Sequence, residues 1–159
     1  MTILEKLEEF LDKNGVVYKR IDHGPTPTSE ESAKARGESM DIGGKALLVK
    51  SNGVYSLFII RASKKLSSKK LRKQLNSKSI RFADGDELFK LTGLIKGAIP
   101  PFGEPILPFR LFIDQTIYRN ERIAFNAGSL YTSFILSVED YLRVAGGTPC
   151  DVAEETIEI

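Results

Sequence analysis

Cysteine and histidine each occur once in this chain of 159 residues, as Cys150 and His23. One cysteine excludes an intrachain disulfide, and one residue of each kind cannot build a Cys-rich or multi-histidine zinc site. The longest strongly apolar runs are short, such as residues 56–60, so the sequence predicts no membrane span. The N-terminus lacks the basic and apolar regions of a secretion signal. We therefore expect a cytoplasmic protein that binds no membrane, metal or other cofactor.

The familiar catalytic sequence motifs are also missing. No G-x-S-x-G elbow, P-loop or G-x-G-x-x-G segment is present. Cys150 follows the last predicted helix in a Gly-Thr-Pro loop, which is a poor place for a positioned nucleophile. The lone His23 is either an acid–base or substrate-contacting group or an ordinary surface residue. An enzyme with this inventory works without a catalytic triad or a metal.

The composition is that of one globular domain, with 42% hydrophobic and 28% charged residues and a net charge of +2. Apolar periodicity, capping residues and glycines predict helices at 2–14, 28–37, 67–75, 84–91 and 137–146. Alternating and apolar runs predict strands at 16–21, 46–50, 54–61, 79–83, 109–113, 122–125 and 130–136, and Asn52-Gly53 predicts a tight hairpin turn. We expect one α+β domain over residues 1–147 with a mixed sheet, followed by an acidic tail over 148–159.

A basic segment extends from Ser63 to Ala83, where eight lysine or arginine residues occur without an acidic one. Lys69 and Lys73 share one face of the predicted helix, with Lys65 nearby, while leucines turn inward. The segment is either a contact for a polyanion such as the RNA backbone or a solvated helix face.

Three further segments suggest a ligand site. Lys45 begins an apolar strand directly after Gly43-Gly44, so its ammonium can lie where the backbone leaves room; it can equally be a lysine at a strand end whose charge reaches solvent. The segment Gly97-Ala98-Ile99-Pro100-Pro101-Phe102-Gly103 is either a rigid loop that a ligand approaches or a cover over the core. Residues 125–129 combine small side chains with one amide, as a pocket or a hairpin turn would.

Taken in order, these segments resemble the YbaK and prolyl-tRNA-synthetase-associated editing family. The resemblance rests on Lys45 opening K-A-L-L-V, the Gly97-x-x-x-Pro101 loop, Phe112-Ile113-Asp114 and Asn126-Ala127-Gly128, and it covers roughly residues 5–142. The segment His23-x-Pro25-x-x-Thr28 is also similar to that family. No synthetase segments accompany the domain, so the chain looks like a free-standing member.

The resemblance implies a mostly antiparallel, curved sheet flanked by helices. It also implies hydrolysis of the ester between a wrong small amino acid and a tRNA, usually one for proline. Lys45 matches the residue tied to activity. The matching substrate-contacting positions are Gly97, Ala98, Ile99, Pro100, Pro101, Phe102, Gly103, Asp114, Asn126, Ala127, Gly128, Ser129, His23 and Thr28. Expected partners are the acceptor end of tRNA, held through Lys65, Lys69 and Lys73, and an aminoacyl-tRNA synthetase, but not DNA.

Two other functions remain open at this point. One is a catalytically silent module of the same fold that binds tRNA or a synthetase, and the other is a hydrolase of small-molecule esters. Some family members carry basic or histidine-containing residues where this chain has Ser129-Leu130-Tyr131. The sequence therefore leaves the amino acid specificity undecided.

Overall fold

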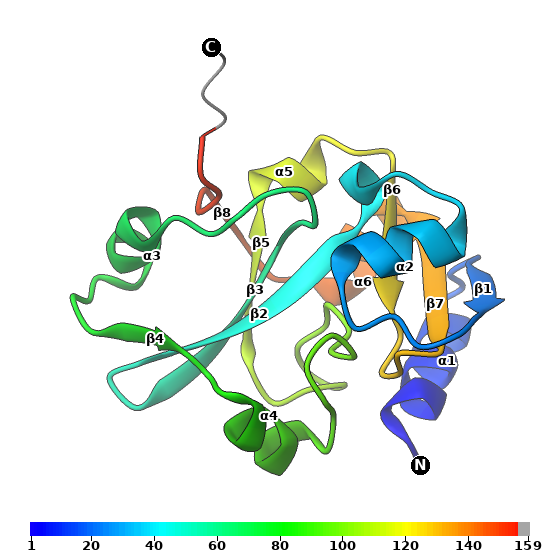
Figure 1. Ribbon diagram of the computed structural model, residues 1–159, viewed down its shortest axis with the longest axis horizontal. Coiled ribbons are helices and arrows are strands. Elements are labelled where there is room, and N and C mark those ends of the chain that lie inside the picture. The colour runs from blue at the N-terminus through cyan, green and yellow to red at the C-terminus, as the bar shows by residue number, and fades with distance from the viewer. Residues whose placement is uncertain (156–159) are drawn as a thin grey trace.

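The computed structural model describes residues 1–155 (Figure 1). Its helices are α1 (Ile3–Lys13), α2 (Ser29–Arg36), the 3-10 turn η1 (Met40–Ile42), α3 (Ser68–Leu75), α4 (Gly85–Thr92), α5 (Gln115–Tyr118) and α6 (Val138–Ala145). Its strands are β1 (Lys19–Asp22), β2 (Gly44–Ser51), β3 (Val54–Arg61), β4 (Ile80–Phe82), β5 (Arg110–Asp114), β6 (Arg122–Asn126), β7 (Thr132–Ser137) and β8 (Thr148–Cys150). Across residues 1–155, no helix has both the length and the apolar character needed to cross a bilayer.

The strands form two sheets instead of the one sheet expected from the sequence. A five-stranded sheet has the order β4-β2-β3-β5-β8, with β5 parallel to both β3 and β8 and the other pairs antiparallel. A three-stranded antiparallel sheet has the order β1-β7-β6. The turn of α5 redirects the chain after β5, so β6 pairs with β7. The prediction of a single α+β domain with mostly antiparallel strands is confirmed.

Two adjacent glycines allow the sheets to meet. Gly43 forms a parallel bridge with Ala124 of β6. A Cβ atom at Gly43 would lie 2.8 Å from Cβ of Ala62, and one at Gly44 would lie 2.7 Å from Cδ1 of Ile123. A side chain at Gly43 would therefore need the backbone around Ala62 to move, and one at Gly44 would need Ile123 to repack, so the glycine pair before Lys45 suits the close packing at the junction of the sheets.

Local sequence signals account for most element boundaries. Thr2 and Glu5 form the predicted capping box of α1, and Ser67 caps α3. Asn52 and Gly53 have φ values of 51° and 78°, as a type I′ hairpin turn requires. The first strand begins at Lys19, three residues later than predicted. The elements η1, α5 and β8 were not predicted from the sequence, because each is four residues or shorter and depends on tertiary contacts.

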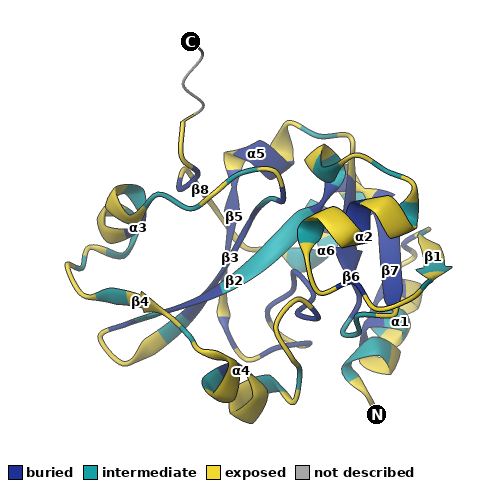
Figure 2. Cartoon of the chain, viewed as in Figure 1, coloured by how far each residue is buried: buried dark blue, intermediate teal, exposed yellow. Residues whose placement is uncertain are grey.

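The main core forms where α1, α6 and the loop after α4, which includes residues 99–109, pack against the buried faces of the strands. Figure 2 shows β3, β5 and β7 as buried and α2 as exposed along its outer face. Phe102 is 1% exposed and makes edge-to-face contacts with Phe10, Phe125 and Tyr141. This aromatic cluster joins the loop over residues 96–108 to three other elements.

The segment expected as an acidic tail contributes to the fold. Thr148–Cys150 form β8, and the side chains of Val152 and Ala153 are buried. Asp114, which is 0% exposed, accepts hydrogen bonds at Oδ1 from the backbone N–H groups of Val152 (2.7 Å) and Ala153 (3.2 Å). Its Oδ2 accepts from N and Oγ1 of Thr116 at 2.9 and 2.7 Å. A buried carboxylate therefore holds residues 152–153 against β5, whereas residues 156–159 lie outside the described part.

We predict that Asp114→Asn lowers the free energy of unfolding by about 2 kcal/mol or more, because the new NH2 group must face donors of Thr116 or of residues 152–153. Urea unfolding measures the loss. Asp151→Asn is the control, because it removes the exposed ion pair with Lys70 and should cost less than about 1 kcal/mol. An Asp114→Asn protein of normal stability would contradict this structural role.

Candidate active site

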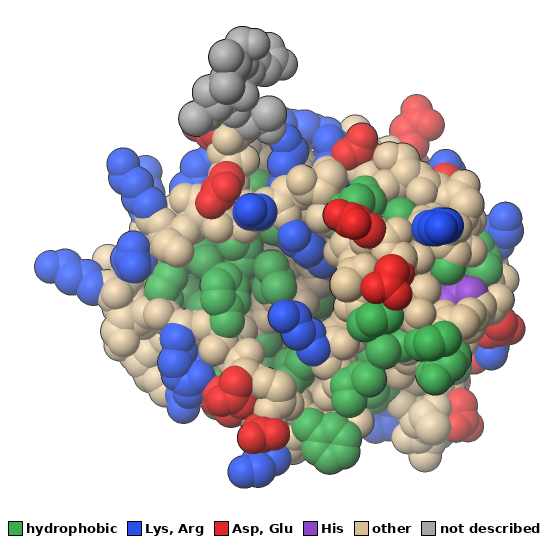
Figure 3. All heavy atoms as spheres, in the orientation of Figure 1, with side chains coloured by type: hydrophobic (Ala, Val, Ile, Leu, Met, Phe, Trp, Pro, Cys, Tyr) green, Lys and Arg blue, Asp and Glu red, His purple; other side chains and the backbone are tan. Residues whose placement is uncertain are grey.

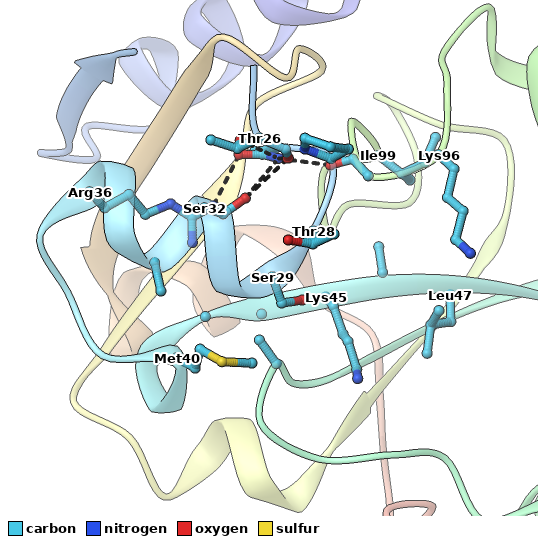
Figure 4. A pocket seen from close by; sticks show the side chains of 18 residues that line it. Thr26, Thr28, Ser29, Ser32, Arg36, Met40, Lys45, Leu47, Lys96 and Ile99 are labelled. Atoms are coloured by element: carbon cyan, nitrogen blue, oxygen red, sulfur yellow. Dashed lines mark hydrogen bonds between the residues drawn. The ribbon is translucent and has the colours of Figure 1, made fainter. Parts of the chain in front are cut away.

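A pocket of about 150 Å3 lies between α2, the start of β2 and the loop that begins at Lys96. Figure 4 shows its lining, with Arg36 and Lys96 toward opposite ends of the view and Lys45 between them. The pocket is lined by Thr26, Pro27, Thr28, Ser29, Ser32, Ala33, Arg36, Met40, Gly43, Gly44, Lys45, Ala46, Leu47, Ala62, Lys96, Gly97, Ile99 and Asn126.

The chemical character of this lining is uneven. The α2 side supplies hydroxyl groups of Thr28, Ser29 and Ser32, and the β2 side supplies small or aliphatic surface. Three cationic side chains line the pocket, and its described lining contains no Asp or Glu. Within residues 1–155, no three His, Cys, Asp or Glu side chains come together in a group that could hold a metal ion. The pocket therefore presents positive charge and hydrogen-bond donors to whatever enters it.

Lys45 lies on β2, opposite Ile60 of β3, and its side chain is partly buried at the pocket. Within the described part of the chain its ammonium has neither a hydrogen-bond acceptor nor an ion-pair partner. Burial lowers the pKa of Lys45 below its ordinary value, and the nearby charge of Lys65 lowers this pKa further. An ammonium group without a carboxylate partner is available to an anionic or partly anionic atom of a ligand.

Asn126 fixes the far wall of the pocket. Its side chain is buried at the end of β6, where Nδ2 donates to the carbonyl of Gly97 at 2.9 Å. The same amide nitrogen lies 3.3 Å from the carbonyl of Thr26 and from Oγ of Ser32. Its Oδ1 accepts from Nη2 of Arg36 at 3.1 Å and from Oγ of Ser133 at 3.1 Å. One amide thus connects α2, the loop before it, β7 and the loop at Gly97.

The glycine- and proline-rich loop has two distinct halves. Gly97 and Ile99 line the pocket. Gly97 has a φ of 92°, and a Cβ atom there would lie 2.9 Å from the carbonyl oxygen of Pro27, so this position requires glycine. In the second half, Phe102 is in the core and the carbonyl of Pro101 accepts a 2.6 Å hydrogen bond from the hydroxyl of Tyr141. The remaining members, Ala98, Pro100 and Gly103, are buried and lie outside the pocket lining.

Several residues expected at the site lie elsewhere. Asp114 has all its described contacts with Thr116 and residues 152–153, as described above. Ala127 is fully buried and Gly128 packs against Ile3 of α1, so both support the β6–β7 turn. Ser129 Oγ accepts from the backbone N–H of Tyr131 at 3.0 Å within that turn.

His23 does not line the pocket but lies next to residues that do. Its Nδ1 lies 2.7 Å from the carbonyl of Gly24, and its Nε2 lies 2.8 Å from Oγ of Ser133. A carbonyl oxygen can only accept, so Nδ1 carries the hydrogen. Ser133 in turn contacts Arg36 and Asn126, so His23 reaches the pocket only through these side chains. Thr28, by contrast, lines the pocket and caps α2 by accepting from the N–H of Glu31 at 3.2 Å.

Arg36 lines the pocket but was not among the site residues expected from the sequence, and the same is true of Ser32 and Lys96. Arg36 is the last residue of α2, and Gly37 in the left-handed conformation ends the helix after it. Burial lowers the pKa of Arg36 to about 10, which leaves it charged at neutral pH. An arginine in the last turn of a helix ordinarily complements the helix dipole, so its sequence position carried no signal of a pocket role.

The basic segment adjoins the pocket through Lys65, whose charge acts on Lys45. Lys69 and Lys73 are exposed on α3, while Lys70 turns to Asp151 and to the carbonyl of Ala153, each at 3.0 Å. Figure 3 shows Lys and Arg side chains over α3 and near the middle of the same face. Cys150 is buried, and burial with two nearby aspartates raises the pKa of its thiol to about 12, so it is no nucleophile.

Comparison with known proteins shows the family to which this chain is similar. The model of the aminoacyl-tRNA editing domain matches residues 23–144. The chain is 35% identical to the Multifunctional Ser/Thr-tRNA deacylase ProXp-y of Escherichia coli over 147 residues, which cover 89% of this chain and 87% of that protein. It is 36% identical over 117 residues to a proline–tRNA ligase of Shouchella clausii, covering 72% of this chain and 20% of the ligase.

A solved structure is similar as well. The crystal structure of a hypothetical protein superposes with a TM-score of 0.84 at 25% identity, covering 94% of this chain and 99% of the other. The matched region contains Lys45, Gly97 and Asn126, the three residues around which the pocket is built. On the family model and on the relative that matches over most of both chains, this protein belongs to the aminoacyl-tRNA editing domain family.

Proposed function

We propose that this protein is a trans-acting aminoacyl-tRNA deacylase that hydrolyses the ester between a wrong small amino acid and a tRNA for proline. The observation that carries the proposal is the pocket itself. Among residues 1–155, the ammonium of Lys45 has no partner, and it lies at a space of about 150 Å3 whose described lining contains no carboxylate. That volume suits a small side chain next to an ester. The printed activity of the Escherichia coli relative makes serine and threonine the first amino acids to test.

In the proposed reaction a water oxygen attacks the ester carbonyl, the bond from the carbonyl carbon to the ribose oxygen breaks, and that oxygen regains a proton as the tRNA leaves. The described pocket lining supplies no carboxylate or imidazole that could act as a general base. An ester carbonyl is already activated, so positioning the substrate and stabilising the developing oxyanion can provide the rate. We assign that electrostatic role, or a contact with the adjacent phosphate, to Lys45. A substrate hydroxyl can orient the water.

The loop at Gly97 and the basic segment over residues 63–83 have separate roles in this scheme. Gly97 and Ile99 shape the space for the amino acid, with Asn126 holding the loop in place. Lys65, Lys69 and Lys73 contact phosphates of the acceptor end, which gives affinity and position without reading bases. A synthetase is the expected companion, because a proline–tRNA ligase contains a segment similar to this chain. The expected place of action is the cytoplasm.

Lys45→Ala should fold normally and lose activity on the order of a hundredfold or more in kcat, since it removes a cation from the reacting centre. Release of the amino acid from mischarged tRNA measures the loss. Lys50→Ala is the matched control on the same strand, where the ammonium lies over the ring of Tyr55, and it should retain activity. Turnover near the wild-type rate in a folded Lys45→Ala protein would remove Lys45 from the mechanism.

The same lysine should control the alkaline side of the pH profile. Because its pKa is lowered, the ammonium is lost at a lower pH than that of an exposed lysine, and kcat/KM should fall there once spontaneous hydrolysis is subtracted. Lys65→Ala removes a repelling charge and should move this fall to higher pH. An aminoacyl-adenosine ester is the appropriate substrate, because it does not reach the basic segment. A profile unaffected by Lys65→Ala would contradict the assignment.

Chelators should leave the activity unchanged, because the reaction as proposed uses no metal ion. The measurement is deacylation of mischarged tRNA after incubation with EDTA, with the tRNA kept folded by monovalent salt. The aminoacyl-adenosine ester serves as a second substrate that needs no folded RNA. If its hydrolysis disappears under EDTA and returns with an added divalent metal, the metal-free scheme is wrong.

The double variant Lys69→Ala/Lys73→Ala should raise KM for aminoacyl-tRNA and flatten its dependence on salt, since fewer counterions are released on binding. Turnover of the aminoacyl-adenosine ester should stay the same. Lys6→Ala/Lys13→Ala removes two exposed lysines from α1 and serves as the charge-matched control. Unchanged KM and salt slope in the α3 variant, or equal effects on both substrates, would favour a hydrolase that does not use the RNA.

A further inference from the structure

Arg36 is a mostly buried cation whose described hydrogen bonds all go to neutral groups. Its Nε donates to Oγ of Ser133 at 2.8 Å and its Nη2 to Oδ1 of Asn126 at 3.1 Å. No carboxylate pairs with it in the described part of the chain. Burying a guanidinium without a counter-charge costs free energy that a neutral glutamine linking the same elements would avoid. The charge therefore suggests a use beyond tying α2 to β6 and β7.

The guanidinium of Arg36 is hydrogen-bonded along one edge, and its Nη1 has no described hydrogen bond. The Nε–Nη2 edge is held by Ser133 and Asn126, which fixes the plane of the group. Nη1 makes no hydrogen bond to the described residues, and it lies 3.8 Å from where a Cβ of Gly43 would be. Nη1 is not fully buried, and both Arg36 and Gly43 line the pocket. A fixed donor thus points into the pocket with its hydrogens free.

This donor lies where the neighbouring lining residues are buried. Ala33, Gly43 and Ala62 surround it and are all buried, whereas Lys96 is exposed. Figure 4 shows Arg36 beside Ser32 on α2, away from Lys96. A substrate whose ester lies near Lys45 and whose tRNA leaves past the exposed Lys96 would place its amino acid side chain toward Arg36.

We propose that Arg36 forms a subsite that recognises a hydroxyl group on the side chain of the esterified amino acid, so that seryl and threonyl esters are selected over apolar esters of equal size. This inference rests on the proposed deacylase function. A guanidinium donates and cannot accept, so it binds a hydroxyl oxygen but offers nothing to an ethyl or methyl group. With a methyl group in its place, the free edge of Arg36 would lose its water without gaining an acceptor.

The test compares esters of one proline tRNA that carry serine or 2-aminobutyrate, whose side chains have the same size and differ by OH against CH3. Wild-type protein should prefer the seryl ester by about ten- to a hundredfold in kcat/KM, the usual worth of a hydrogen bond to a charged group. Arg36→Gln should reduce this preference to within about threefold. Lys34→Gln, which removes an exposed charge from the same helix, should keep the wild-type preference.

The outcomes separate this subsite from the deacylase activity. Hydrolysis of either ester by the wild-type protein supports the activity, and absence of both would refute the activity and the subsite together. The subsite is refuted if the wild-type protein cleaves the two esters at equal rates, or if Arg36→Gln loses activity equally on both. Arg36 would then have only a structural role. An aspartyl ester cleaved faster than the seryl one would show a carboxylate receptor instead. If Arg36→Gln does not fold, the preference for the seryl over the 2-aminobutyryl ester is compared between the wild-type protein and Arg36→Lys.

Discussion

The side-chain amide of Asn126 is the interaction on which the pocket depends. It is buried at the end of β6 and binds the carbonyl of Gly97, the guanidinium of Arg36 and the hydroxyl of Ser133. These partners belong to three segments that are far apart in the sequence, and of the three only Ser133 is also a strand-pairing partner of Asn126. Because the amide of Asn126 is buried and satisfied by these groups together, it holds all of them in one arrangement. The site therefore depends on one satisfied polar network that joins α2 and the loop at Gly97 to the three-stranded sheet.

The chemistry follows from what this network places around the pocket. Positive charge gathers at Arg36, Lys45 and Lys96, and no carboxylate in the described lining offsets it. Such a site cannot activate water by removing its proton with a carboxylate, but it can stabilise negative charge on a carbonyl oxygen or a phosphate. An aminoacyl-tRNA carries both groups within a few bonds of each other. The proposed contacts of Lys65, Lys69 and Lys73 with tRNA phosphates would extend this positive surface from the pocket to α3.

The sequence predicted the fold wherever local signals are strong. Capping residues, the Asn52-Gly53 turn and alternating strands place most elements correctly, because these signals act within a few residues. Lys45, Gly97, Thr28 and Asn126 were also found, through the family resemblance. By contrast, Asp114 and Phe102 belong to segments that carry the family resemblance but are buried away from the pocket, and motif membership does not show where a side chain points. Arg36 was missed because its role depends on contacts with β6 and β7, roughly 90 residues or more away in the sequence.

The most direct test of the account is the release of amino acid from a purified proline tRNA charged with serine, compared with the same tRNA charged with proline. The account predicts many turnovers on the seryl-tRNA and little release from the prolyl-tRNA, because a pocket of about 150 Å3 with a fixed donor among buried lining residues suits a small hydroxylated side chain. Release no faster than spontaneous hydrolysis on the seryl-tRNA would contradict it.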